Sequence, residues 1–219
     1  LISIPGPARE ALVSYLLDDM AKYAVGLLDA LEIDAAHVVG ASMGGMIAQI
    51  VAGAFPGRAK SLISIMSTPD VAKSPPIPEA MSGNGAPPAP GEEGRIRSFM
   101  DGWRALGTEK FGPSDEELRS FAVRCLERAH YPQGPARQVA AIQASPGREA
   151  MLAGLDIPTL VIHGTEDPFI PLIGGELTAK AIPGAEFIAI EGMGHELFSP
   201  SARLIADMIG THIENAECT

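Results

Sequence analysis

The sequence lacks the features of a membrane, secreted or nucleic-acid-binding protein. The 219-residue sequence contains no run of about 18 apolar residues without a charged residue or a turn former, so no transmembrane helix is predicted. No basic segment precedes an apolar one, so we expect no signal peptide and a cytoplasmic location. The chain has 16 Lys and Arg against 27 Asp and Glu, a formal net charge of -11. Because a field of that sign repels phosphate backbones and anionic lipid headgroups, neither nucleic acid nor a membrane is an expected partner.

Cysteines and metal-ligand patterns are also scarce. The two cysteines, Cys125 and Cys218, lie far apart with no Cys or His at metal spacing beside them, so the pattern supports no disulfide. His163, Glu166 and Asp167 would offer ligands from a single turn, but no further histidine follows at helical spacing. We therefore predict neither a metal site nor a cofactor.

What the sequence does contain is an alternation of short apolar runs and amphipathic segments. The expected strands cover 36–39, 61–66, 159–162 and 186–190. The expected helices beside them cover 18–31, 43–55, 175–181 and 201–213. Strand, helix and strand at this spacing imply right-handed parallel crossovers. The predicted fold class is therefore α/β, a mostly parallel sheet flanked by helices.

The middle of the chain differs in composition. Between Ser67 and Gly94, prolines alternate with Gly, Ser and Asn without any period, which is typical of a linker or the edge of a lid. Helical patterns follow over 95–106, 114–129 and 136–143, and the second begins with a capping box at Ser114. We predict a small helical cap inserted into one core. The predicted divisions are 1–68 for the first part of the core, 69–150 for the linker and cap, and 151–219 for the second part.

The junction between the first strand and its helix carries a possible nucleophile. Gly40-Ala41-Ser42-Met43-Gly44 fits the pattern G-x-S-x-G, which marks a tight turn that projects a serine at the carboxyl end of a sheet. A glycine-rich turn with a capping serine is the competing interpretation. Since a serine hydroxyl is a weak nucleophile at neutral pH, the catalytic interpretation requires a base and an orienting acid elsewhere.

Two later loops supply candidates for those roles. Asp167, after the strand at 159–162, would accept an imidazole N–H, with an Asp-Pro turn as the alternative and Glu166 as a rival expected to face water. His195 lies in a glycine-flanked loop after the strand at 186–190, and it alone combines a loop, a strand end and the chain order Ser, Asp, His. The other histidines are assigned to strand ends, the cap and the last helix: His37, His163, His130 and His212.

Longer segments resemble the α/β-hydrolase superfamily, and within it the carboxylesterase group that includes aclacinomycin methylesterase-like proteins and cofactor-free perhydrolases. The segments are HVVGASMGGMIAQ at 37–49, HGTEDP at 163–168 and GMGH at 192–195, with shorter ones at 18–21, 28–31 and 65–68. By this resemblance, which covers about 16–213, Ser42 is the nucleophile, His195 the general base and Asp167 the orienting acid.

The predicted activity is hydrolysis of short to medium acyl carboxylic esters through an acyl-enzyme. Met193 and Phe169 are the predicted substrate contacts. Several methionines are candidates for an adaptable acyl pocket, with core filling as the alternative, which is favoured for Met66: Met43, Met46, Met66, Met151 and Met193. Four arginines are expected to be exposed and not to bind a charged substrate: Arg95, Arg97, Arg104 and Arg148.

The chain departs from the family pattern before its first helix. Family members ordinarily have several strands there and a His-Gly loop that supplies the second oxyanion N–H, whereas no His-Gly precedes Ser42. The N–H of Met43 is therefore the predicted oxyanion donor, and a weak esterase is expected unless another group replaces the second donor. We interpret the fold as truncated at its amino terminus, as a natural short form or a fragment. The strand at 36–39 would then lie at a sheet edge, so we expect a homo-oligomer or association with another chain through that edge.

Two alternative functions remain open at this point. The same three residues would serve a cofactor-free perhydrolase that uses hydrogen peroxide as the acyl acceptor. A non-catalytic remnant would instead bind a small apolar ligand or a partner chain through the uncovered strand. The intact trio argues against the remnant, because a chain under no chemical demand tolerates the loss of any member.

Overall fold

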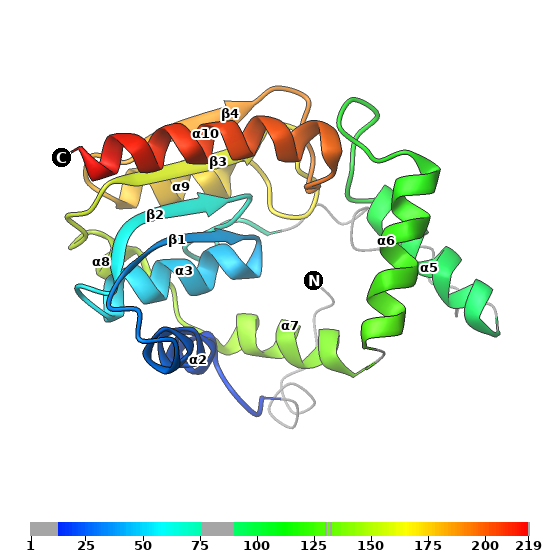
Figure 1. Ribbon diagram of the computed structural model, residues 1–219, viewed down its shortest axis with the longest axis horizontal. Helices are drawn as coiled ribbons and strands as arrows, with labels where there is room; N and C mark the ends of the chain where they lie inside the picture. The colour runs from blue at the N-terminus through cyan, green and yellow to red at the C-terminus, as the bar shows by residue number, and fades with distance from the viewer. Residues whose placement is uncertain (1–12, 76–89, 130, 132, 219) are drawn as a thin grey trace.

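The computed structural model describes residues 13–75, 90–129, 131 and 133–218. Its centre is a sheet of four parallel strands in the order β1-β2-β3-β4 (Figure 1). The strands are β1 Ala36–Ala41, β2 Ala59–Ile65, β3 Thr159–Gly164 and β4 Glu186–Ile190. The helices are α2 Leu17–Ala30, α3 Met43–Ala54, α5 Glu92–Arg104, α6 Asp115–Arg128, α7 Gly134–Ala144, α8 Glu149–Leu152, α9 Ile173–Ala181 and α10 Ser199–Glu217. The predicted α/β class is confirmed.

Helices cover both faces of the sheet, as parallel strands require. Successive side chains of a strand point to opposite faces, and β2 shows the consequence. Leu62 packs with Ala48 and Ala52 of α3, whereas Ile63 packs with Ile205 of α10. Helices α3 and α9 therefore lie on one face and α10 lies on the other (Figure 1).

The element bounds follow the sequence patterns closely. The strand predicted at 186–190 has those bounds, and the other predicted strands and helices differ at their ends by one to four residues. The short helix α8 was not predicted, because four residues are too few to show a period. The predicted cap at Ser114 is present, since its side chain accepts the N–H of Glu117 at 3.2 Å, but the carboxylate of Glu117 accepts from Ser199 and does not complete the predicted capping box. Residues 76–89 of the predicted linker lie outside the described part.

The segment predicted to form a cap contains the helices α5, α6 and α7. Helices α5 and α6 pack against each other to one side of the sheet, and α7 runs back beneath it (Figure 1). Four aromatic rings hold this region together, with centroids 5.5 to 6.4 Å apart in the contacting pairs: Phe99, Trp103, Phe121 and Phe198. Because Phe198 immediately precedes α10, the ring cluster joins the cap to the core.

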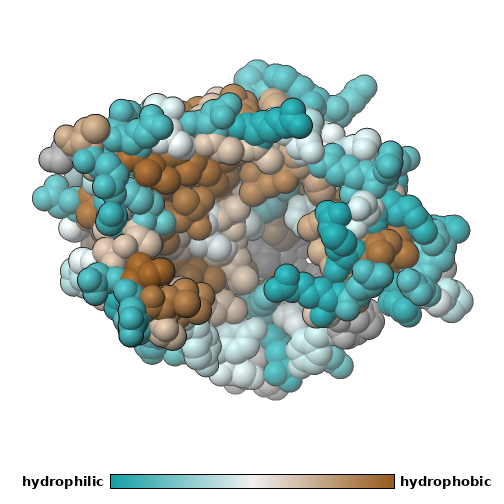
Figure 2. Space-filling model, in the orientation of Figure 1, coloured by the Kyte–Doolittle hydropathy of each residue, from teal (hydrophilic) through white to brown (hydrophobic). Residues whose placement is uncertain are grey.

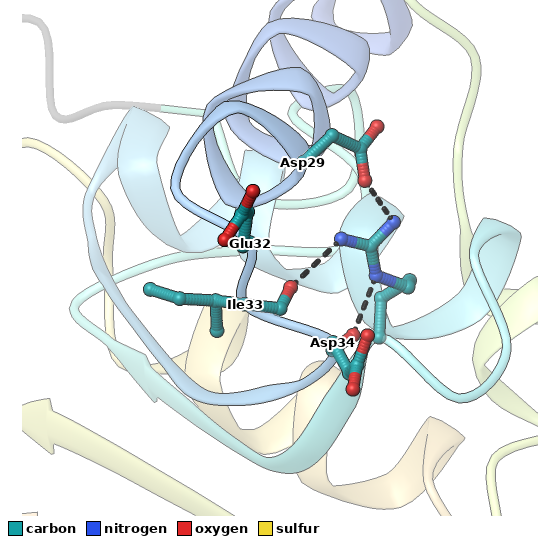
Figure 3. A pocket seen from close by; sticks show the side chains of 5 residues that line it. Asp29, Glu32, Ile33 and Asp34 are labelled. Atoms are coloured by element: carbon teal, nitrogen blue, oxygen red, sulfur yellow. Dashed lines mark hydrogen bonds and ion pairs between the residues drawn. The ribbon is translucent and has the colours of Figure 1, made fainter.

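One surface hollow lies beside the turn between α2 and β1, and Arg58 is among the residues that line it (Figure 3). Its guanidinium donates to the carboxylate of Asp29 at 2.6 Å and to the main-chain carbonyls of Ile33 and Asp34 at 3.1 and 2.7 Å. Glu32 in this turn has a φ of 55°. These hydrogen bonds occupy the guanidinium of Arg58, so Arg58 holds the turn that leads into β1.

The edge at β1 is open within the described ranges, where β1 pairs with β2 alone. Apolar surface gathers over β1 between α2 and α10 (Figure 2). Exposed apolar side chains on these elements include Leu27 of α2 at 60%, Leu31 just after α2 at 58% and Val39 of β1 at 45%. None of the described helices combines the length and apolarity needed to span a bilayer.

Candidate active site

Ser42 sits on a strained turn between β1 and α3. Its φ of 55° and ψ of −123° lie in a region that L-residues rarely adopt. The turn closes because two neighbours lack side chains. A Cβ on Gly40 would collide with the carbonyl of Gly44, and a Cβ on Gly45 would lie 2.6 Å from the Cβ of Ser67. The Ser42 hydroxyl makes no capping bond to α3, so the capping interpretation does not describe this turn.

The structure brings the three predicted residues together. Ser42 Oγ lies 2.9 Å from His195 Nε2, and His195 Nδ1 lies 2.7 Å from Asp167 Oδ2. They follow β1, β4 and β3 respectively, whose carboxyl ends share one edge of the sheet. With Nδ1–H donating to the carboxylate, Nε2 is free to accept the serine proton. His195 is buried, which shields this chain of bonds from water.

The carboxylate of Asp167 is held on both oxygens. Its Oδ1 accepts the backbone N–H groups of Phe169 and Ile170, each at 2.8 Å. Asp167 therefore both starts a turn and faces the imidazole, so the two alternative interpretations of this residue hold together. Its rival Glu166 is exposed. His163 Nε2 lies 3.6 Å from Asp167 Oδ2 and donates to the carbonyl of Ile170 at 2.7 Å. Burial lowers the pKa of His163, so this ring is a neutral support for the acid.

A cavity of about 250 Å³ opens beside Ser42. It lies between the start of α3, the cap helix α7 and the loop after Asp167. Its lining residues are Ser42, Met43, Met46, Pro135, Gln138, Val139, Ile142, Phe169 and Ile170. Phe169 therefore stands at the cavity, where it was expected to contact substrate. Its ring also meets His195 edge-on, with centroids 5.1 Å apart.

The structure corrects the expectation for Met193. Its side chain is fully buried with Ile190 and Ile205 and does not line the cavity, because the turn after β4 directs it into the core. Its carbonyl instead accepts the N–H of Glu166 at 2.9 Å and ties the two loops together. Of the other predicted pocket methionines, Met43 and Met46 line the cavity, and Met66 packs in the core.

The exposure expected of Arg148 is also wrong. Arg95, Arg97 and Arg104 are exposed, but Arg148 is only 6% exposed. Its guanidinium donates to the side chain of Gln49 at 3.1 Å and to the carbonyl of Thr68 at 2.7 Å. Burial lowers the pKa of Arg148 to about 10, so it remains charged at neutral pH. It joins the end of the cap to α3 and does not reach the cavity.

The position of Met43 suits an oxyanion donor. It is the first residue of α3, so its N–H has no acceptor within the helix and lies at the positive end of the helix dipole. Within the ranges described above, no three His, Cys, Asp or Glu side chains gather closely enough to hold a metal ion.

Comparison with known proteins places this arrangement in a family. Residues 3–202 match the family described as alpha/beta hydrolase fold. The chain belongs to the α/β hydrolase fold family. This α/β hydrolase is 30% identical over 207 residues to rhodomycin D methylesterase DauP from a Streptomyces species, covering 85% of this chain and 70% of the relative. It is also 30% identical over 216 residues to 2-hydroxymuconate semialdehyde hydrolase from a Pseudomonas species, covering 95% of this chain and 72% of the relative.

Solved structures give the same fold. A meta-cleavage product hydrolase from Pseudomonas fluorescens IP01 superimposes on this α/β hydrolase with a TM-score of 0.71 at 20% identity, covering 93% of this chain and 73% of that one. Together, the family and the relatives support a hydrolase or esterase activity in general terms.

Proposed function

We propose that this chain is a serine carboxylesterase that cleaves uncharged esters with short to medium acyl groups. One observation carries the proposal: a continuous chain of hydrogen bonds runs from Ser42 through His195 to Asp167 beside an apolar cavity. Acyl transfer requires a nucleophilic serine, a base hydrogen-bonded to its hydroxyl, and an acid hydrogen-bonded to that base.

The first half of the reaction forms an acyl-enzyme. Ser42 Oγ attacks the ester carbonyl while His195 Nε2 takes its proton. Asp167 stabilises the imidazolium that forms and holds the ring in the required tautomer. The N–H of Met43 donates to the oxygen that becomes negative. When the tetrahedral intermediate collapses, His195 returns the proton to the departing alcohol oxygen.

The second half releases the acid. Water enters, His195 takes one of its protons, and the resulting hydroxide equivalent attacks the acyl carbon. Ser42 leaves as the hydroxyl once His195 returns that proton. The burial of the imidazole and the acid keeps their interaction strong throughout both halves.

The cavity supports a small uncharged acyl group. Its volume lies below the roughly 300–1,000 Å³ that is typical of sites for drug-sized ligands. Its lining side chains carry no charge, and a buried carboxylate or ammonium of a substrate would find no counter-ion there. The methylesterases among the relatives act on esters by name, which agrees with this proposal.

The test is hydrolysis of p-nitrophenyl acetate and p-nitrophenyl butyrate by the wild type and Ser42→Ala. We expect the substitution to lower the rate by up to about 10⁶-fold, and a fluorophosphonate to label Ser42 alone by mass spectrometry. Equal rates for the two proteins, or no label at Ser42, would contradict the proposal. In the same assay, peracid formation with added hydrogen peroxide decides whether a perhydrolase shares the site.

A cavity variant tests the acyl assignment. Val139→Phe fills the cavity from α7. We expect the ratio of butyrate to acetate turnover to fall by about 10-fold or more, because one methylene in an apolar pocket is worth about 10- to 200-fold. Acetate turnover serves as the internal control for folding. An unchanged ratio would place the acyl group elsewhere.

A further inference from the structure

One turn of the cap, between α5 and α6, makes hydrogen bonds to the His195 loop. The backbone N–H of His195 donates to the carbonyl of Leu106 at 2.8 Å. The hydroxyl of Thr108 lies 2.8 Å from the carbonyl of Gly192. The ammonium of Lys110 donates to the carbonyl of Glu191 at 2.7 Å. The loop after β4 has no regular secondary structure, so these contacts act together with the bond from His195 to Asp167 to hold its imidazole in place.

The carboxyl of Glu196 lies inside this contact, although no sequence motif indicated a role for it. Its side chain is fully buried. Oε1 lies 3.0 Å from the hydroxyl of Thr108 and accepts the N–H of Gly194 at 3.3 Å. Oε2 is buried and has no hydrogen-bond partner among the residues described. The chemistry proposed above does not use this acid.

The proton count in the contact favours a neutral carboxyl. A hydroxyl carries one hydrogen, and the carbonyl of Gly192 can only accept. When Thr108 donates to Gly192, its contact with Glu196 requires a hydrogen from the carboxyl. Burial raises the pKa of Glu196, and this effect and the smaller one of the Asp167 charge together outweigh the hydrogen bonds from Gly194 and Thr108 that lower it.

We propose that neutral Glu196 and Thr108 form a latch that fixes the cap turn on the loop of His195. Glu196 is then a positioning residue, which acts through His195 and does not touch the substrate. The effect on rate rests on the proposed function, because it depends on holding the imidazole 2.9 Å from Ser42 Oγ. A misplacement of about 1 Å costs up to about 100-fold in rate.

The first test compares Glu196→Ala with Glu196→Gln in ester hydrolysis. We expect the Ala variant to lower kcat by about 10- to 100-fold with little change in KM, since the cavity is untouched. Gln is neutral, has nearly the same shape and can both donate and accept, so its kcat is expected within about 3-fold of the wild type. Glu127→Ala, at an exposed site on α6, is the matched control and should leave kcat unchanged. A Gln variant as impaired as the Ala variant would overturn the neutral latch.

The second test does not depend on activity. Hydrogen exchange of the His195 amide, followed by NMR, reports its bond to Leu106 directly. We expect Glu196→Ala and Thr108→Val to accelerate this exchange, and Glu196→Gln to leave it slow. Thr108→Val keeps the side-chain shape, so it decides the matter if the Ala variant does not fold. If Thr108→Val leaves both kcat and the exchange of the His195 amide unchanged, the latch is refuted. A wild type without esterase activity refutes the proposed function alone, because the exchange data still test the latch.

Discussion

At the scale of single residues, Asp167 illustrates how a turn former becomes an acid. Its Oδ1 is occupied by two backbone N–H groups, so the carboxylate cannot rotate. Its Oδ2 is thereby directed at His195, 2.7 Å away. Glu166, one residue earlier, is exposed. The local turn therefore selects which of two adjacent carboxylates serves the imidazole.

This selection predicts different outcomes for two neighbouring amides. We expect Asp167→Asn to lower kcat for p-nitrophenyl butyrate by about 10⁴-fold, because an amide at this position favours the wrong tautomer of the imidazole. Glu166→Gln is the matched control and should stay within about 2-fold. Circular dichroism of both variants checks that each is folded. Comparable losses in the two variants would remove Asp167 from its assigned role.

Neighbouring residues also mark the limit of prediction from local pattern. Phe169 and Met193 were both expected to contact substrate, and of the two only Phe169 lines the cavity beside Ser42. Both are apolar residues in loops after strands. Which of them faces the cavity is decided by the packing of β4 and α10 around Met193. Spacing along the chain does not contain that information.

At the scale of elements, Arg148 links the segment that follows the cap helix α7 to the core through hydrogen bonds. It precedes α8 and reaches Gln49 on α3, whose side chain in turn donates to Ser64 of β2 at 3.3 Å. Gln49 is fully buried. A helix, a strand and the end of the cap thus share one buried polar network, which is stable only while every member has its partner.

Removing the cation from this network should destabilise the fold. Arg148→Met leaves the buried oxygens of Gln49 and Thr68 without their donor, and we expect the free energy of unfolding to fall by about 3 kcal/mol. Arg97→Met removes an arginine that is exposed on α5, and should change it by less than about 0.5 kcal/mol. Urea unfolding of both variants measures the difference. A loss for Arg148→Met no larger than that for Arg97→Met would show that the network carries no stability.

At the scale of the whole molecule, β1 lies at the end of the sheet and pairs with β2 alone among the described residues. Its open edge lies beside the apolar surface of Figure 2, and Leu27, Leu31 and Val39 are exposed apolar residues of α2, its C-terminal end and β1. An open edge strand and an exposed apolar patch both favour association. We propose that this face binds another chain, with a second copy as the first candidate.

Association through this face predicts a specific response to charge. We expect light scattering after size exclusion to give a mass above that of one 22.9 kDa chain for the wild type. Val39→Lys should shift the protein toward the monomer, because a charge on an edge strand opposes pairing. Tyr131→Lys, at an exposed apolar site outside this face, is the control and should leave the mass unchanged. A monodisperse wild-type monomer would contradict the proposal.

The sequence by itself determined the fold class, every described element except α8 with ends within four residues, and the choice of Ser42, Asp167 and His195 as candidates. These follow from apolar periods and from short motifs at strand ends, which are local and can be read along the chain. Only the tertiary structure decided that Arg148 is buried, that Met193 faces the core, and that Glu196 meets Thr108 across 88 residues. Such contacts join segments far apart in the chain, and their geometry exists only after the sheet and cap have packed.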